Sequence, residues 1–110
     1  MPIHYYQDDN GYVVYENTRT GKVVRVWDGD LASAVEICQA WHGGQDSPCY
    51  RLMSSDFSYR NLHRALTELR YAQRLADESG AKIDGDDYLD LLTTIEDLEG
   101  IVRRIDTIAD

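Results

Sequence analysis

The fold is decided by one stretch near the start of the chain, Tyr5-Tyr6-Gln7-Asp8-Asp9-Asn10-Gly11-Tyr12-Val13-Val14-Tyr15. Two segments rich in Tyr and Val flank the pair Asn10-Gly11. Asn-Gly is the preferred centre of a type I′ turn, because both central positions of that turn need a positive φ. The stretch therefore predicts an antiparallel hairpin.

A second turn follows at Thr18-Arg19-Thr20-Gly21 and leads into the apolar segment Lys22-Val23-Val24-Arg25-Val26-Trp27. Gly21 suits the left-handed position of a bulged three-residue loop. Residues 3–27 are therefore predicted to form a three-stranded antiparallel β-meander.

The pairing register of this sheet can be counted from the two glycines. It places Tyr6 opposite Tyr15 and Val13 opposite Trp27. Both faces of the sheet are then apolar, whereas a sheet with one face in water alternates more cleanly. One face collects Tyr5, Tyr12, Val14, Val24 and Val26, and the other collects Tyr6, Val13, Tyr15, Val23 and Trp27, with Arg25 among them. We expect one face to meet helices and the other to meet another chain or a ligand.

The remainder of the chain is predicted to be helical. Asp28-Gly29-Asp30 supplies a turn and an N-cap for a short amphipathic helix over residues 30–42, and Gly43-Gly44 ends it. Residues 45–55 have the Ser and Pro content of a loop.

Two longer amphipathic helices are predicted over residues 56–79 and 86–109. Their connection is so short that they must form an antiparallel hairpin. The second helix carries an additional apolar set, which the sheet and first helix or a second copy of the chain must cover: Tyr88, Leu92, Ile101 and Ile108. The whole chain, 1–110, is thus predicted to be one α+β domain.

Length and charge limit the function. A chain of 110 residues, 43% hydrophobic, has room for one core. Its 20 acidic and 11 basic residues give a net charge of −9, which disfavours duplex nucleic acids and anionic membranes and favours partners with a basic surface. No export or membrane segment is recognisable, so we expect a cytoplasmic protein whose two cysteines, Cys38 and Cys49, stay reduced.

Several site patterns fail when their spacing is tested. The acids around Asp84 do not form an EF-hand, because Tyr88 and Ile95 occupy ligand positions. A zinc site drawn from Cys38, His42 and Cys49 lacks a fourth ligand. No acid–base constellation is apparent, so we expect neither an enzyme nor a cofactor.

Charge is segregated between the two long helices. Residues 57–76 hold four arginines and one acid, whereas residues 77–99 hold nine acids and one lysine. Ion pairs between antiparallel helices explain this pattern. The alternative is a site for a phosphate or nucleotide on one stripe of the arginine-rich helix, made by Arg60, His63, Arg64, Tyr71 and Arg74.

Of three function classes, an enzyme is the least favoured by the sequence. The preferred prediction is a small acidic protein that binds and inhibits a partner, similar in general character to phage- or mobile-element-encoded inhibitors such as anti-CRISPR proteins, immunity proteins and antitoxins. This likeness is one of size, charge and lack of motifs. A homodimer or larger oligomer is expected. The predicted contact residues are Tyr6, Tyr15, Trp27, Tyr50, Asp84, Asp86 and Asp87. The alternative is an oligomer that sequesters an anionic, nucleotide-like ligand on the arginine stripe.

Overall fold

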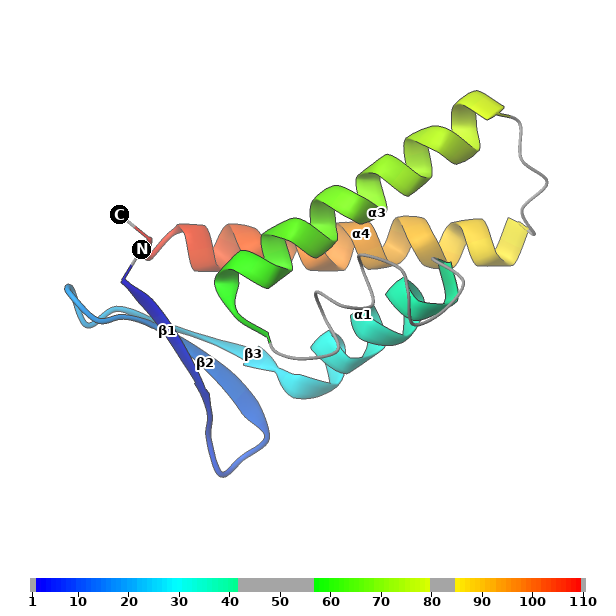
Figure 1. Ribbon diagram of the computed structural model, residues 1–110. Helices are drawn as coiled ribbons and strands as arrows, with labels where there is room; N and C mark the ends of the chain where they lie inside the picture. The colour runs from blue at the N-terminus through cyan, green and yellow to red at the C-terminus, as the bar shows by residue number, and fades with distance from the viewer. Residues whose placement is uncertain (1, 42–56, 80–84, 110) are drawn as a thin grey trace.

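The computed structural model describes residues 2–41, 57–79 and 85–109. Three antiparallel strands come first and pair in the order β1-β2-β3. Helices follow, and the elements in chain order are β1 (Ile3–Gln7), β2 (Tyr12–Asn17), β3 (Val23–Trp27), α1 (Asp28–Trp41), α3 (Tyr59–Ser79) and α4 (Gly85–Asp106) (Figure 1). The predicted α+β fold is confirmed. None of the helices described is both long and apolar enough to cross a membrane.

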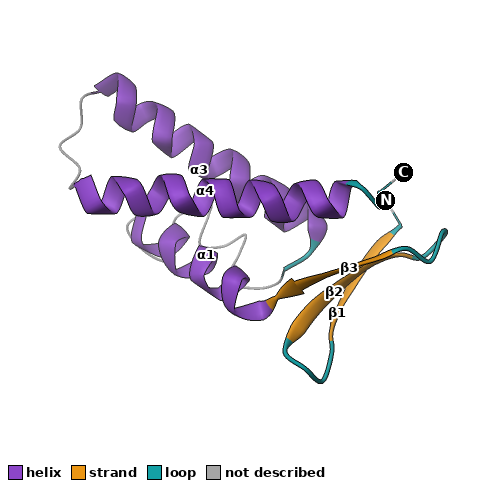
Figure 2. Ribbon diagram, turned by 180° about the vertical axis from the view of Figure 1, so that it is seen from behind, coloured by secondary structure: helices purple, strands orange, loops and turns teal. Residues whose placement is uncertain are grey.

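The helices pack together, and the sheet lies across one end of them (Figures 1 and 2). Helices α3 and α4 are antiparallel neighbours, and α1 packs against α4. The two chain termini lie close together beside the sheet. The result is an elongated molecule of 46 × 26 × 23 Å, in which α3 ends and α4 begins at the end opposite the sheet.

Element boundaries differ from the predicted ones by a few residues. Helix α1 begins directly after β3, at Asp28. Helix α3 begins at Tyr59, because the Oγ of Ser58 accepts a hydrogen bond from the backbone N–H of Asn61 and so acts as the N-cap. Residue 56, where this helix was predicted to begin, and the predicted loop over residues 45–55 lie outside the described residues.

The register of the first hairpin is one residue away from the predicted register. Tyr5, not Tyr6, pairs with Tyr15. The loop has three residues, because the backbone N–H of Asp8 bonds the carbonyl of Tyr12 at 2.9 Å. The Oδ1 of Asp8 accepts hydrogen bonds from the backbone N–H groups of Asn10 and Tyr12. Gly11 has φ 85°, but Asn10 does not have the positive φ that a type I′ turn needs.

The second hairpin is displaced in the same way and for the same reason. Val13 pairs with Val26, and the loop between Asn17 and Lys22 has four residues instead of three. The side-chain oxygen of Asn17 accepts hydrogen bonds from the backbone N–H groups of Arg19 and Thr20. An Asp or Asn at the last strand position therefore lengthens each loop by one residue.

The two one-residue displacements of the pairing register cancel between β1 and β3. Only β2 therefore has its two faces exchanged relative to the prediction. Residues that face each other across a sheet lie on the same face, so Tyr6 and Trp27 stay together as predicted. On β2, however, Val13 and Tyr15 move to the opposite face, which packs on the helices, while Tyr12 and Val14 join Tyr6 and Trp27.

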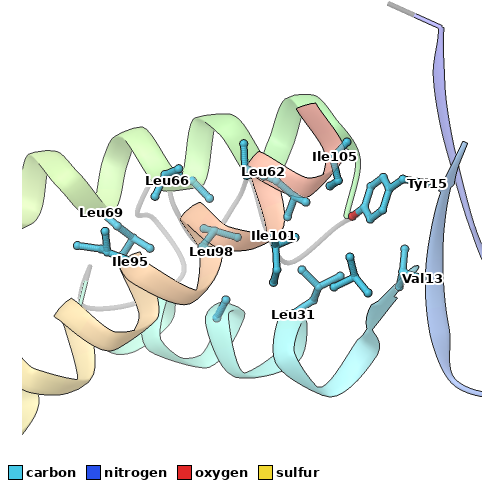
Figure 3. Packing of buried hydrophobic residues seen from close by; sticks show 14 of the residues in the cluster. Val13, Tyr15, Leu31, Leu62, Leu66, Leu69, Ile95, Leu98, Ile101 and Ile105 are labelled. Atoms are coloured by element: carbon cyan, nitrogen blue, oxygen red, sulfur yellow. The ribbon is translucent and has the colours of Figure 1, made fainter. Parts of the chain in front are cut away.

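The hydrophobic core lies between the inner face of the sheet and the three helices. Figure 3 shows Tyr15 and Val13 pointing from the sheet toward Leu31, Leu62 and Ile105. Ile101 and Ile108 of the additional apolar set are buried within the same chain. Neighbouring elements therefore cover that part of α4, and a second copy is not needed for it.

Asn17 is the buried polar side chain at the edge of this core. Its Nδ2 donates a hydrogen bond of 2.6 Å to the carbonyl oxygen of Ile108, 91 residues later in the chain. The same side chain therefore stabilises the second hairpin loop and holds it against the C-terminal end of α4.

We predict that Asn17→Ala lowers the free energy of unfolding by about 1 to 3 kcal/mol, because it leaves the Ile108 carbonyl buried without its donor. Urea denaturation followed by circular dichroism measures the change. The matched control is Lys22→Ala directly after the same loop, an exposed position at which a change within about 0.5 kcal/mol is expected. Equal losses in both variants would contradict the role assigned to Asn17.

Candidate functional site

The outer face of the sheet exposes large apolar side chains to solvent. Four residues from all three strands are at least one-third exposed: Tyr6 (44%), Tyr12 (37%), Val23 (51%) and Trp27 (49%). Val14 is buried on the same face. We call the surface formed by Tyr6, Tyr12, Val23 and Trp27 the aromatic face. Tyr12 pairs with Trp27, whereas Arg25 separates Val23 from Trp27 along β3. Large apolar side chains exposed together on one face are typical of a binding site.

Trp27 is exposed but held in place. Its ring packs against two glycines, since a Cβ added to Gly29 would lie 2.5 Å from the indole Nε1 and one added to Gly11 would lie 3.4 Å from Cζ3. The ring of Tyr12, directly opposite on β2, meets the indole edge to face at a centroid distance of 5.2 Å. The first hairpin loop and the start of α1 therefore fix the orientation of the indole.

Four carboxylates belong to the two segments that hold Trp27. Asp8 and Asp9 lie in or beside the first loop, and Asp28 and Asp30 lie in the first turn of α1. The loop and the helix are joined where the backbone N–H of Asp28 bonds the carbonyl of Gly11 at 3.2 Å. We call Asp8, Asp9, Asp28 and Asp30 the acidic rim.

The predicted contact residues separate into different places. Tyr6 and Trp27 lie together on the aromatic face, as predicted. Tyr15 is fully buried, and its hydroxyl donates to the carbonyl of Phe57, so the prediction that it belongs to the contact surface is wrong.

The acids predicted to contribute to the contact surface are not found on the aromatic face among the described residues. Asp86 is in the first turn of α4, at the end of the molecule opposite the sheet. Asp87 is in the same turn, but its side chain is not described, and Tyr50 and Asp84 lie outside the described residues. Sequence reasoning missed Tyr12 and the acidic rim. The signal in the sequence was partial: Asp28 and Asp30 closely follow Trp27, but only the structure shows that the loop with Asp8 and Asp9 also approaches it.

The arginines of α3 are only partly explained by pairing with α4. Arg70 forms an ion pair of 2.8 Å with Glu99, as the charge segregation predicted. In the part of the chain that the structure describes, no carboxylate forms an ion pair with Arg60, Arg64 or Arg74. The guanidinium of Arg74 instead lies 5.5 Å from the ring centroid of Tyr71.

A concavity of about 440 Å³ lies at the N-terminal end of α3, where β1 approaches it. The residues described around it are Ile3, Ser58, Tyr59, Arg60, His63 and Arg64. The ring of His63 packs edge to face on Tyr59 at 4.5 Å. The carboxylate of Asp106 accepts a hydrogen bond from the Tyr59 hydroxyl and lies 3.4 Å from Nε2 of His63.

This environment changes the acidity of Tyr59. Burial, together with the hydrogen bond to Asp106 and its negative charge, raises the pKa of Tyr59 to about 12. The neutral phenol is therefore the form that the fold stabilises.

Metal binding gains no support from the described residues, in which no three His, Cys, Asp or Glu side chains are grouped to hold an ion. Of the three zinc ligands considered from the sequence, Cys38 lies in α1, but its side chain is not described. His42 and Cys49 lie outside the described residues.

No protein-family model matches this chain, and neither a curated protein nor a solved structure shows significant similarity to it.

We predict that Gly29→Ala displaces the Trp27 ring, because the new Cβ would overlap the indole. In a Trp41→Phe background the change appears in the fluorescence and near-UV circular dichroism of Trp27. The control is Gly100→Ala in α4, where an added Cβ meets nothing within 4 Å. That variant should leave the Trp27 signal unchanged and gain about 0.5 to 1 kcal/mol of stability. An unchanged indole spectrum in Gly29→Ala would contradict the described packing.

A second prediction concerns alkaline pH. Because the folded-state pKa of Tyr59 is raised from 10.0 to about 12, its contribution to stability is complete below pH 10 and is lost as the pH rises toward 12. Absorbance titration at 295 nm should show a late tyrosine ionisation that Tyr59→Phe removes. The hydrogen bond to Asp77 also raises the pKa of Tyr88, so Tyr88→Phe is the background in which this ionisation is followed. Asp106→Asn should move that ionisation toward lower pH. The assignment to Tyr59 would be contradicted if Tyr59→Phe, in the Tyr88→Phe background, left the amplitude of the late ionisation unchanged.

Proposed function

We propose that this chain is a small acidic, cytoplasmic interaction protein that binds a basic surface of another protein through its aromatic face and acidic rim, and inhibits it. One observation carries the proposal: Trp27 is 49% exposed but fixed by Gly11, Gly29 and Tyr12. An aromatic ring that is already ordered loses little side-chain entropy on binding and is therefore a favourable contact residue.

The chemistry of the surface favours a cationic partner. The faces of Trp and Tyr rings attract Lys and Arg side chains, and a Trp face does so most strongly. The acidic rim places carboxylates on the two segments that hold the indole, where they can pair with the same cations. The net charge of −9 would increase the rate of association with a basic surface.

A second copy of the chain fits this surface less well. One of the two sequence arguments for a homodimer was the wide apolar surface of α4, and Ile101 and Ile108 are buried within one chain. The aromatic face remains available, but two copies joined through it would bring two chains of charge −9 together. A basic protein has the complementary charge.

One residue on this face limits which partners fit. Arg25 pairs with Val14 on the outer face and is exposed. A partner must therefore present a carboxylate or carbonyl oxygen opposite Arg25 and cations opposite the acidic rim. Only a basic surface whose charges match the positions of Arg25 and the acidic rim would bind well. This requirement would make the interaction specific. Occupation of that surface would exclude the anionic ligands that the partner binds there.

We predict that a fluorescein-labelled hexa-arginine peptide binds the protein and that Trp27→Ala weakens binding about tenfold, which corresponds to ~1.4 kcal/mol. Fluorescence anisotropy at low and high salt measures the affinity. Asp9→Asn combined with Asp30→Asn should weaken binding and reduce its salt dependence.

Two controls separate this surface from general attraction to an acidic protein. Tyr71→Ala removes an aromatic ring of similar exposure from α3, and Asp97→Asn removes an exposed acid from α4. Both should bind the peptide as the wild type does. Equal weakening in the control variants would refute the proposed surface. Sedimentation velocity tests whether a second copy of the chain occupies the aromatic face. A dimer that Trp27→Ala dissociates would assign that face to self-association.

A further inference from the structure

We infer that the concavity at the N-terminal end of α3 is a second binding site, which takes the phosphate group of a small molecule between Arg60 and Arg64. The site does not involve the aromatic face. It is independent of the proposed protein partner, because the two surfaces share none of the residues named for them.

The two arginines have the right spacing for a single anion. Residues four apart on a helix lie one above the other, with about 5 to 6 Å between their Cβ atoms. Arg60 and Arg64 both line the concavity. Two guanidinium groups that approach from neighbouring turns can donate paired hydrogen bonds to the oxygens of one phosphate.

No described carboxylate lies within ion-pair distance of either guanidinium, although Glu68 follows Arg64 by one helical turn. In a chain of charge −9, most cations are expected to find carboxylates, as Arg70 does with Glu99. Neither Arg60 nor Arg64 forms an ion pair with a described carboxylate, although Asp106 lies at the same end of α3. Asp106 is engaged by the Tyr59 hydroxyl and lies beside His63.

The structure restricts the proposed site to the N-terminal end of the arginine stripe, where Arg60 and Arg64 lie. Arg60 and Arg74 are 14 residues apart, which is about 21 Å along a helix and too far for one small anion. Arg74 is placed over the Tyr71 ring, so that ring is already in contact with a cation. A phosphate with little contribution from a stacked base therefore fits better than a nucleotide bound along the whole stripe.

Thermal denaturation with increasing inorganic phosphate, at constant ionic strength set with chloride, tests the site. A ligand that binds only the folded state raises the melting temperature by mass action. We expect phosphate to raise the melting temperature of the wild type by a few degrees, and Arg60→Ala and Arg64→Ala each to abolish that rise. The matched control is Arg74→Ala, which removes the same charge from the same helix and should respond as the wild type does.

A parallel series with adenosine monophosphate separates the two sources of the phosphate group. An equal response to both identifies the phosphate alone as the ligand, and a larger response to the nucleotide shows that its nucleoside also contacts the site. Both outcomes require loss of the response in Arg60→Ala and Arg64→Ala. No rise in the wild type with either compound, or the same rise in all variants, would overturn the inference. Hexa-arginine binding should be unaffected by Arg60→Ala, so the two proposals can fail separately.

Discussion

The side chains of Asp8 and Asn17 set the pairing of the sheet, and the rest of the structure depends on that pairing. Asp8 follows β1 and accepts hydrogen bonds from the backbone N–H groups of Asn10 and Tyr12. Asn17 ends β2 and accepts hydrogen bonds from those of Arg19 and Thr20. Because side chains alternate between the faces of a strand, a displacement of one residue would exchange the core face of β2 for its solvent face. The loops therefore determine that Tyr15 is buried and that Tyr12 stands beside Trp27.

The same loops position the candidate surface. Gly11 ends the first loop with a positive φ and also lies against the indole of Trp27. Gly29, at the start of α1, lies against the same indole near its Nε1 atom. A turn that defines the register thus also orders the residue on which the proposed interaction depends. This double use explains how a surface tryptophan can be rigid without being buried.

Much of the fold could be predicted from the sequence, because strand composition, helical periodicity and short connections are local signals. The meander, the short helix and the two long helices lie close to their predicted positions. The pairing register could not be predicted, because two opposing local preferences act on the first loop. Asn10-Gly11 favours a two-residue turn, whereas the hydrogen bonds that the Asp8 carboxylate accepts favour a three-residue loop. Tyr6 and Trp27 were placed together correctly, since the two errors of register cancel between β1 and β3. The acids near the α4 N-terminus were assigned to the same surface from charge alone, and charge carries no information on distance.

The hydrogen bond between Asn17 and the Ile108 carbonyl joins segments that are synthesised 91 residues apart. The sheet can form early because its contacts are local, but its inner face is completed by Ile105 and Ile108. At 5 to 20 residues per second, the ribosome needs roughly 5 to 18 s to add the intervening 91 residues. During that interval the outer face of the sheet is exposed, and its inner face lacks the part of its cover that Ile105 and Ile108 supply. Assistance from a chaperone would therefore be most useful before α4 is complete.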